Sequence, residues 1–144
     1  MALKPGMDEN QLKNFMAKMK RLKRFSEKEF SREIGTVCFA TARKARRKIS
    51  GHIALRQSIY VKKISHKAVQ VGAISRIAPY IEFGTGPFVN VEYLLKLGFP
   101  RSYAMQFKGK VDGNTIAEPF FFISFDAALA EGVKRINKKL KNFK

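Results

Sequence analysis

Hydrophobic residues recur at helical spacing near the start of the chain. Between residues 8 and 24, the large apolar residues are Leu12, Phe15, Met16, Met19 and Leu22, and lysine and arginine fill six of the twelve remaining positions. Apolar side chains three and four residues apart share one side of a helix. The pattern therefore predicts an amphipathic helix over residues 8–24, with an almost purely basic polar side.

A second helix is predicted directly after the first. The sequence Ser26-Glu27-Lys28-Glu29 has the form of a capping box, in which the serine hydroxyl and the second glutamate satisfy free amides of a new first turn. We expect this helix to run from Glu27 to about Ile49 and to stop near Gly51. Its apolar side consists of Phe30, Ile34, Val37, Cys38, Thr41, Ala45 and Ile49.

The hydrophobic period changes from Ile53 onward. Residues 55–64 and 68–73 are rich in strand formers and alternate partly between apolar and polar positions. The intervening Ser65-His66-Lys67 is short enough for a hairpin turn, so two antiparallel neighbouring strands are predicted.

The stretch from Pro79 to residue 118 has a mixed pattern. Pro79–Pro87 is a short apolar segment that runs into two glycines and a proline, which indicates a short strand or helical turn before a tight loop. Beyond it, we expect a short helix over Val91–Leu97, a strand over Tyr103–Lys108 and a polar, turn-rich loop over Gly109–Asn114.

The C-terminal part is strongly apolar and then helical. Pro119-Phe120-Phe121-Phe122 is expected to be buried, either in the core or against another subunit. A last helix is predicted from about Ser124 to Leu140, with an apolar stripe of Phe125, Leu129, Val133, Ile136 and Leu140. The order of elements predicts one α+β domain over residues 1–144, in which the helical part (8–49) and the C-terminal helix (124–141) pack on a small antiparallel sheet with its loops (53–122).

The charge of the chain points to an anionic neighbour. There are 29 lysines and arginines against 11 aspartates and glutamates, a net charge of +18, and no acidic residue stands between Glu33 and Glu82. DNA, RNA or an acidic protein surface would suit this pattern, and any nucleic acid would be held through phosphates without base reading. The candidate surface is Arg43, Lys44, Arg46, Arg47 and Lys48. The alternative is that this run is simply a solvated helix end.

No arrangement of residues typical of catalysis or metal binding occurs. The two histidines, His52 and His66, and the single cysteine, Cys38, lack metal-ligand spacing, and no Gly-Lys-Ser/Thr follows Gly84 and Gly86. We therefore expect no enzyme activity, metal or cofactor. A lone helical cysteine favours a buried thiol in a reducing compartment, and the lack of a leader-like or membrane-spanning segment predicts synthesis in the cytoplasm without a membrane partner.

Three blocks resemble one known family. They are Ser-Gly-His-Ile-Ala-Leu-Arg-Gln-Ser-Ile at 50–59, Val71-Gly72 followed by Ala-Pro-Tyr-Ile-Glu-Phe-Gly-Thr-Gly at 78–86, and Glu-Pro-Phe-Phe at 118–121. In order and spacing they resemble the tail-completion, or head–tail joining, proteins of long-tailed bacteriophages, over roughly residues 50–136. The chain departs from the family in a longer connection at 88–117 and in Phe121-Phe122-Ile123, where Leu-Arg-Pro is usual.

The resemblance implies a structural, non-catalytic role in the neck of the virion. Such proteins form homo-oligomeric rings, commonly hexamers, around the DNA channel, and contact a head-completion or connector protein on one side and a tail tube or tail terminator protein on the other. The basic run at 43–48 would then face genomic DNA or an acidic partner. The expected subunit or partner contacts are Glu82, Phe83, Gly84, Thr85, Phe88, Pro119, Phe120, Phe121 and Phe122.

Other interpretations remain open at this point. The segment Glu82–Thr85 would, alternatively, be a turn that caps the sheet, and Glu82 could pair with Arg76 or with an arginine of a neighbouring subunit. The chain as a whole could instead be a sequence-independent nucleic-acid-binding protein, acting as a monomer or dimer. A small enzyme is the third possibility, and it would need a composite site between subunits.

Overall fold

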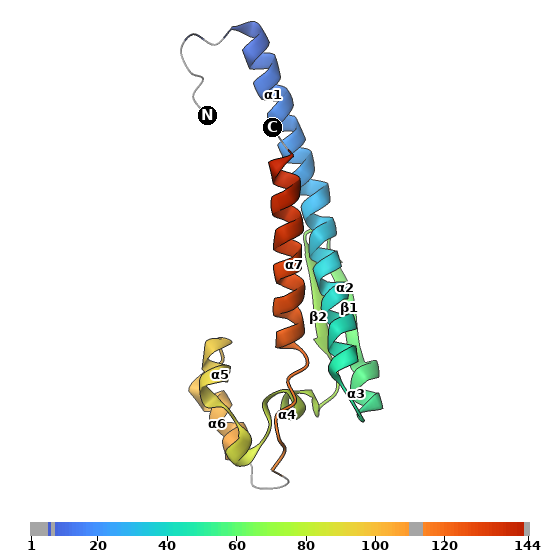
Figure 1. The fold of residues 1–144 in the computed structure, drawn as a ribbon, viewed down its shortest axis with the longest axis vertical. Helices are drawn as coiled ribbons and strands as arrows, with labels where there is room; N and C mark the ends of the chain where they lie inside the picture. The colour runs from blue at the N-terminus through green and yellow to red at the C-terminus, as the bar shows by residue number, and fades with distance from the viewer. Residues whose placement is uncertain (1–5, 7, 110–113, 143–144) are drawn as a thin grey trace.

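The protein consists of a long helical rod, a second helix beside it, a β-hairpin and a group of short helices (Figure 1). The computed structural model describes residues 6, 8–109 and 114–142. Helix α2 (Phe30–Lys48) contacts both the C-terminal helix α7 (Phe122–Lys141) and the hairpin. The arrangement confirms the predicted α+β class.

The N-terminal rod is one continuous helical segment. Helix α1 (Glu9–Arg24) passes through a π-helical turn, η1 (Phe25–Glu29), directly into α2. The rod begins at a capping box formed by Asp8, whose side chain accepts from the backbone N–H of Gln11 at 2.7 Å, while the Gln11 side chain accepts from the Asp8 amide at 3.2 Å.

The predicted helix start at Ser26 is therefore wrong. The Ser26 hydroxyl donates to the carbonyl of Lys23 at 2.9 Å, and the carboxylate of Glu29 contacts Lys139 at 3.1 Å. A serine inside a helix satisfies its hydroxyl on the preceding turn, so the same residues that cap a helix also fit its interior. A π-helical turn holds one residue more than an α-helical turn, so the rod continues through Phe25–Glu29 without a break.

The hairpin formed by β1 (Ile59–Ser65) and β2 (Ala68–Ala73) is antiparallel, as predicted, with Val61 opposite Val71. The part of the first strand predicted before Ile59 is wrong, because residues 53–58 form helix α3 (Ile53–Ser58). The helical turn places Leu55 in the core with no exposed surface. The Ser58 hydroxyl donates to the Leu55 carbonyl at 2.7 Å, which fits one turn of helix.

The described parts of the region between the hairpin and α7 contain short helical elements joined by loops, and no strand. These elements are α4 (Ala78–Phe83), the 3-10 turn η2 (Gly86–Phe88), α5 (Val91–Lys96) and α6 (Arg101–Lys108). The helical turn near 79–83 and the helix near 91–97 are confirmed, but the strand predicted at 103–108 is wrong. Of the predicted loop at Gly109–Asn114, residues 110–113 lie outside the described part.

An aromatic cluster explains why residues 103–108 are helical. Tyr103 and Phe107 lie one helical turn apart and contact each other edge to face, with ring centroids 5.0 Å apart. Phe107 also contacts Phe83 at 5.6 Å, and Tyr103 stacks on Phe99 at 5.0 Å. Helical spacing brings both rings to the same side, whereas a strand would need a partner strand to satisfy its backbone.

Helix α7 packs against α2 through small residues. Its helical span is confirmed, but its buried residues are Ser124, Ala128 and Gly132. A Cβ atom added to Gly132 would lie 2.5 Å from Cγ2 of Val37, so the two helices approach closely at this point. Of the larger apolar residues of the predicted stripe, Phe125 also packs on this contact, whereas Leu129, Val133 and Leu140 remain exposed, Val133 to 47%.

Candidate functional site

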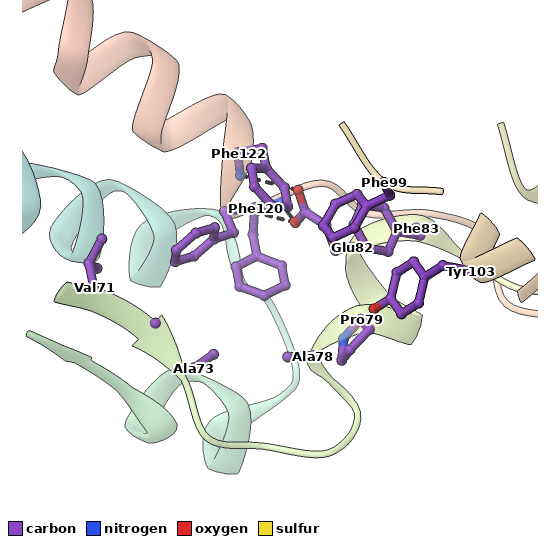
Figure 2. Close-up of a pocket in the computed structure, with 12 residues that line it drawn as sticks. Val71, Ala73, Ala78, Pro79, Glu82, Phe83, Phe99, Tyr103, Phe120 and Phe122 are labelled. Atoms are coloured by element: carbon purple, nitrogen blue, oxygen red, sulfur yellow. Dashed lines mark hydrogen bonds between the residues drawn. The ribbon is translucent and has the colours of Figure 1, made fainter. Parts of the chain in front are cut away.

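The carboxylate of Glu82 forms the junction between α4 and the start of α7 (Figure 2). It accepts hydrogen bonds from the backbone N–H groups of Phe120 at 2.8 Å, Phe121 at 2.9 Å and Phe122 at 3.2 Å. Glu82 is only 3% exposed. The first amides of a helix lack partners within that helix and form its positive end, so a buried anion placed there stabilises the helix.

The local backbone at Gly84 makes this junction possible. Gly84 has φ +76°, and its N–H donates to the carbonyl of Tyr80 at 2.9 Å. A Cβ atom at this position would lie 2.7 Å from the carbonyl oxygen of Thr115. The close approach lets Thr85 donate to that same oxygen at 2.9 Å, while the Glu118 amide donates to Ile81 at 2.8 Å. The segment before α7 is thereby held along the end of α4.

An apolar pocket of about 260 Å³ lies beside the Glu82 junction. Its walls come from β2, α4, α6 and the first residues of α7, and they include Pro79, Phe99 and Tyr103 (Figure 2). Both carboxylate oxygens of Glu82 are already occupied by backbone amides. The pocket therefore suits an apolar side chain better than it suits acid–base chemistry.

Most of the contact residues predicted at 82–88 lie inside the chain. Glu82, Phe83, Gly84 and Thr85 are buried, and the Thr85 hydroxyl accepts from the Thr115 amide at 2.7 Å. Their observed contacts are intramolecular and join the end of α4 to the segment before α7, so this block is not the turn capping the sheet that was the alternative interpretation. Phe88 differs, because it is 47% exposed and remains a candidate for partner contact.

The predicted contact residues at 119–122 lie between the core and the surface. Phe120 is 2% exposed and belongs to the core cluster around Leu55, whereas Pro119, Phe121 and Phe122 are partly buried. Burial of this segment in the core is thus confirmed for Phe120.

The predicted basic surface at the end of α2 is divided between internal contacts and solvent. Lys44 forms an ion pair with Glu131 at 3.2 Å, and Arg46 donates to the carbonyl of Ile59 at 2.7 Å. The other three cations of the run, Arg43, Arg47 and Lys48, are exposed and form no ion pair with another described residue. These three, together with the remaining N–H groups of the exposed Arg46, are available to bind an external anion.

An ionic cluster that the sequence did not reveal joins α2 to α7. The carboxylate of Glu33, 5% exposed, contacts Arg135 Nε and Lys139 Nζ, each at 2.8 Å, and Lys139 also contacts Glu29 at 3.1 Å. Burial by itself would raise the pKa of Glu33, but the hydrogen bonds from Lys139 and Arg135 outweigh it and hold that pKa below its usual value. The hydrogen bonds that Lys139 donates to Glu33 and Glu29 raise the pKa of Lys139. Glu29 and Glu33 are four residues apart, and so are Arg135 and Lys139, so each like-charged pair lies on one side of its helix. This spacing was the signal in the sequence for the cluster.

Residues able to carry chemistry do not gather elsewhere in the described chain. Cys38 is buried, burial raises the pKa of its thiol, and its Sγ lies 3.7 Å from the carbonyl oxygen of Val69. Among the described residues, no three histidine, cysteine or acidic side chains cluster as metal ligands would. None of the described helices combines the length and hydrophobicity needed to cross a bilayer.

Comparison with known proteins adds no relative. No protein-family model matches the chain, and no significant match occurs among curated proteins or solved structures.

Proposed function

We propose that the protein is a structural component of a bacteriophage neck, which assembles as a homo-oligomeric ring and joins the head to the tail around the DNA channel. The resemblance of residues 50–136 suggests this role. The structural observation that supports it most directly is the amount of apolar surface that α1 and α7 leave outside the core of the chain.

Helix α1 is the clearer case. All of its residues are described, and none of them is buried. Met16 is 62% exposed, Met19 38% and Leu22 43%. A helix of 16 residues that buries none of its side chains is only marginally stable in water, because most helical stability in proteins comes from the packing of an apolar face. An apolar partner surface would stabilise it.

Helix α7 presents a second such surface. Leu129, Val133 and Leu140 are 41–47% exposed, and with the half-buried Ile136 they follow heptad spacing. This spacing is typical of a seam that packs against another helix. Because the two apolar surfaces lie on different helices, contact between α1 of one copy and α7 of the next would be heterologous, and such contacts form a ring when the rotation between successive copies closes.

The net charge of +18 opposes association of identical copies. Salt screens this repulsion, because the Debye length falls to about 10 Å at 0.1 M ionic strength. A polyanion in the channel would also reduce the repulsion between copies, because its phosphates would neutralise the exposed Arg43, Arg47 and Lys48 without sequence preference. Ring assembly is therefore expected to strengthen with added salt or DNA.

Negative-stain imaging and analytical ultracentrifugation, on the protein alone, with DNA and with tail tubes, test the proposal. Closed rings, or caps on tube ends, are the expected result. The variants Met16→Gln/Met19→Gln on α1 and Leu129→Gln/Val133→Gln on α7 should each abolish them. Met105→Gln is the matched control, because Met105 is 45% exposed on α6, away from both seams. A strict monomer under all three conditions, or rings that persist in both seam variants, would overturn the proposal.

The exposed cations favour one alternative, a sequence-independent nucleic-acid-binding protein. That protein would bind free DNA tightly without forming rings, and its affinity would fall steeply as salt rises. Filter binding with DNA and ultracentrifugation without DNA, each at several salt concentrations, separate the two functions, because DNA-free ring assembly should strengthen with salt whereas free-DNA affinity should fall.

A further inference from the structure

A groove of about 520 Å³ lies between α2 and the β-hairpin, lined by residues that the Glu82 junction does not use. Its floor includes Val61 and Val69, which are half-buried, and Gly35 of α2. A Cβ atom added to Gly35 would meet no other atom within 4 Å, so the glycine leaves open space in the wall of the groove. Phe39, 64% exposed, adds an aromatic ring to the same surface.

Cations surround this apolar floor. Lys28 and Arg32 come from the helical rod and Lys63 from β1, and none of the described residues that line the groove is acidic. Arg32, whose side chain is exposed, lies 3.8 Å from the half-buried carboxylate of Glu29, a contact that contributes little in water. Lys63 is opposite Val69 in the hairpin and lies on the side of the sheet that faces α2. The Lys63 side chain is exposed at the groove, so its ammonium group is accessible to an external anion.

We propose that this groove binds an acidic amphipathic segment of a different protein. Apolar side chains of that segment would cover Val61, Val69 and Phe39, and its carboxylates would pair with Lys28, Arg32 and Lys63. Charge complementarity carries the choice of occupant, since the rim is cationic and the floor is apolar.

The same observations disfavour two other occupants. A single-stranded nucleic acid needs a series of aromatic platforms for successive bases, and the described lining of the groove offers two aromatic rings, those of Phe39 and His66. A second copy of this chain has a net charge of +18, which the cations of the groove would repel. Its sequence has one pair of consecutive acidic residues, Asp8 and Glu9, and so offers no acidic segment to the groove. The partner is therefore a separate, acidic protein, and the proposal holds whether or not the chain forms a neck ring.

Fluorescence anisotropy with the full-length chain tests the groove. The probe is a labelled synthetic peptide of alternating leucine and glutamate, and the comparison peptides replace leucine by serine or glutamate by lysine. We expect Lys63→Glu to weaken binding of the first peptide by about tenfold or more, as when one member of a close charge pair is reversed. Lys62→Glu is the matched control, because it makes the same change in net charge on the opposite face of the same strand.

A steric variant gives an independent measurement. Gly35→Leu places a side chain in the groove, and leucine is a much better helix former than glycine, so the fold should remain intact by circular dichroism. Binding of the Leu/Glu peptide should be lost. Equal affinity for Lys62→Glu and Lys63→Glu, or equal binding of the serine peptide, would overturn the proposal. Tighter binding of oligothymidylate with the same dependence on Lys63 would also overturn it, because the groove would then be a nucleic-acid site.

Discussion

The carboxylate of Glu82 accepts a hydrogen bond from the backbone N–H of Phe120, 38 positions later in the chain, at 2.8 Å. The same carboxylate accepts from Phe121 and Phe122, so one side chain of α4 satisfies three amides at the start of α7. The hydrogen bonds fix where α7 begins, and they bring Phe120 into the core and Phe122 against the aromatic cluster around Phe83.

Glu82→Gln should therefore destabilise the chain, by about 3 kcal/mol, because the amide replaces one charged acceptor with an N–H₂ group that faces backbone donors. Urea denaturation measures the change in the free energy of unfolding. Glu118→Gln is the control, since Glu118 is exposed in the same segment. Equal stability of the two variants would show that the carboxylate does not act as the helix cap.

Gly132→Ala should destabilise the chain by about 1–3 kcal/mol, because the added methyl group meets Cγ2 of Val37 at 2.5 Å and a β-branched side chain adjusts poorly. The matched control is Gly35→Ala on the other helix, where the added Cβ meets nothing and helix propensity should stabilise by about 1 kcal/mol. Thermal denaturation distinguishes the opposite signs.

A double variant checks that the cause is the contact between the helices. Val37→Ala removes the obstructing methyl groups, so Val37→Ala/Gly132→Ala should be more stable than the sum of the single effects predicts, by about 0.5 kcal/mol or more. Simple additivity would count against close packing at this position.

The ionic cluster of Glu33 and Lys139 predicts how stability depends on pH. The pKa of Glu33 is held below its usual value of 4.5 in the folded chain, so its contribution is complete above that pH and is lost as the pH falls through the lowered pKa. The pKa of Lys139 is raised above its usual 10.5, so its contribution is complete below that pH and is lost as the pH rises through the raised pKa. The cluster therefore stabilises the α2–α7 contact across the neutral range.

Glu33→Gln should remove part of the loss of stability that the chain shows in acid. Denaturation midpoints measured from pH 3 to pH 7 test this, because the range extends from roughly one and a half units below to a few units above the usual carboxylate pKa. Lys13→Met is the comparison variant, because its ion pair with Glu9 at 2.9 Å is exposed and should contribute little. A Glu33→Gln chain with the acid dependence of the parent would contradict the assignment.

Hydrogen exchange should differ along the continuous rod. Amides of α1, which has no buried residue, should exchange much faster than those of α2, whose Ala42 and Ala45 lie in the core. Mass spectrometry of the exchanging chain measures this, and conditions that produce rings should slow the exchange of α1 selectively. Equal protection of both helices in the monomer would show that α1 is stabilised without a partner.

The sequence alone determined the elements whose patterns are local. Helical periodicity located the rod and α7, and two alternating runs around a short turn located the hairpin, because these signals depend on residues within one or two turns. The α+β class followed from their order. The resemblance drew attention to Ala78–Gly86, and the structure makes that block the buried support of α7, with its Gly84 at φ +76°.

Only the tertiary structure decided the features that depend on contacts between distant residues. Ser26 has the sequence of a helix start but lies within a helix, because its hydroxyl bonds to Lys23 and the turn continues. Tyr103–Lys108 is helical because its aromatic residues meet Phe83 and Phe99. Ala128 and Gly132 of α7, together with Phe125, pack against α2, while Leu129 and Val133 stay exposed, because the close approach of the two helices decides which side of α7 is covered. Which partners Glu82 and Glu33 would find, 38 and 102 positions away, could not be read from local spacing, because these hydrogen bonds exist only once the helices have packed.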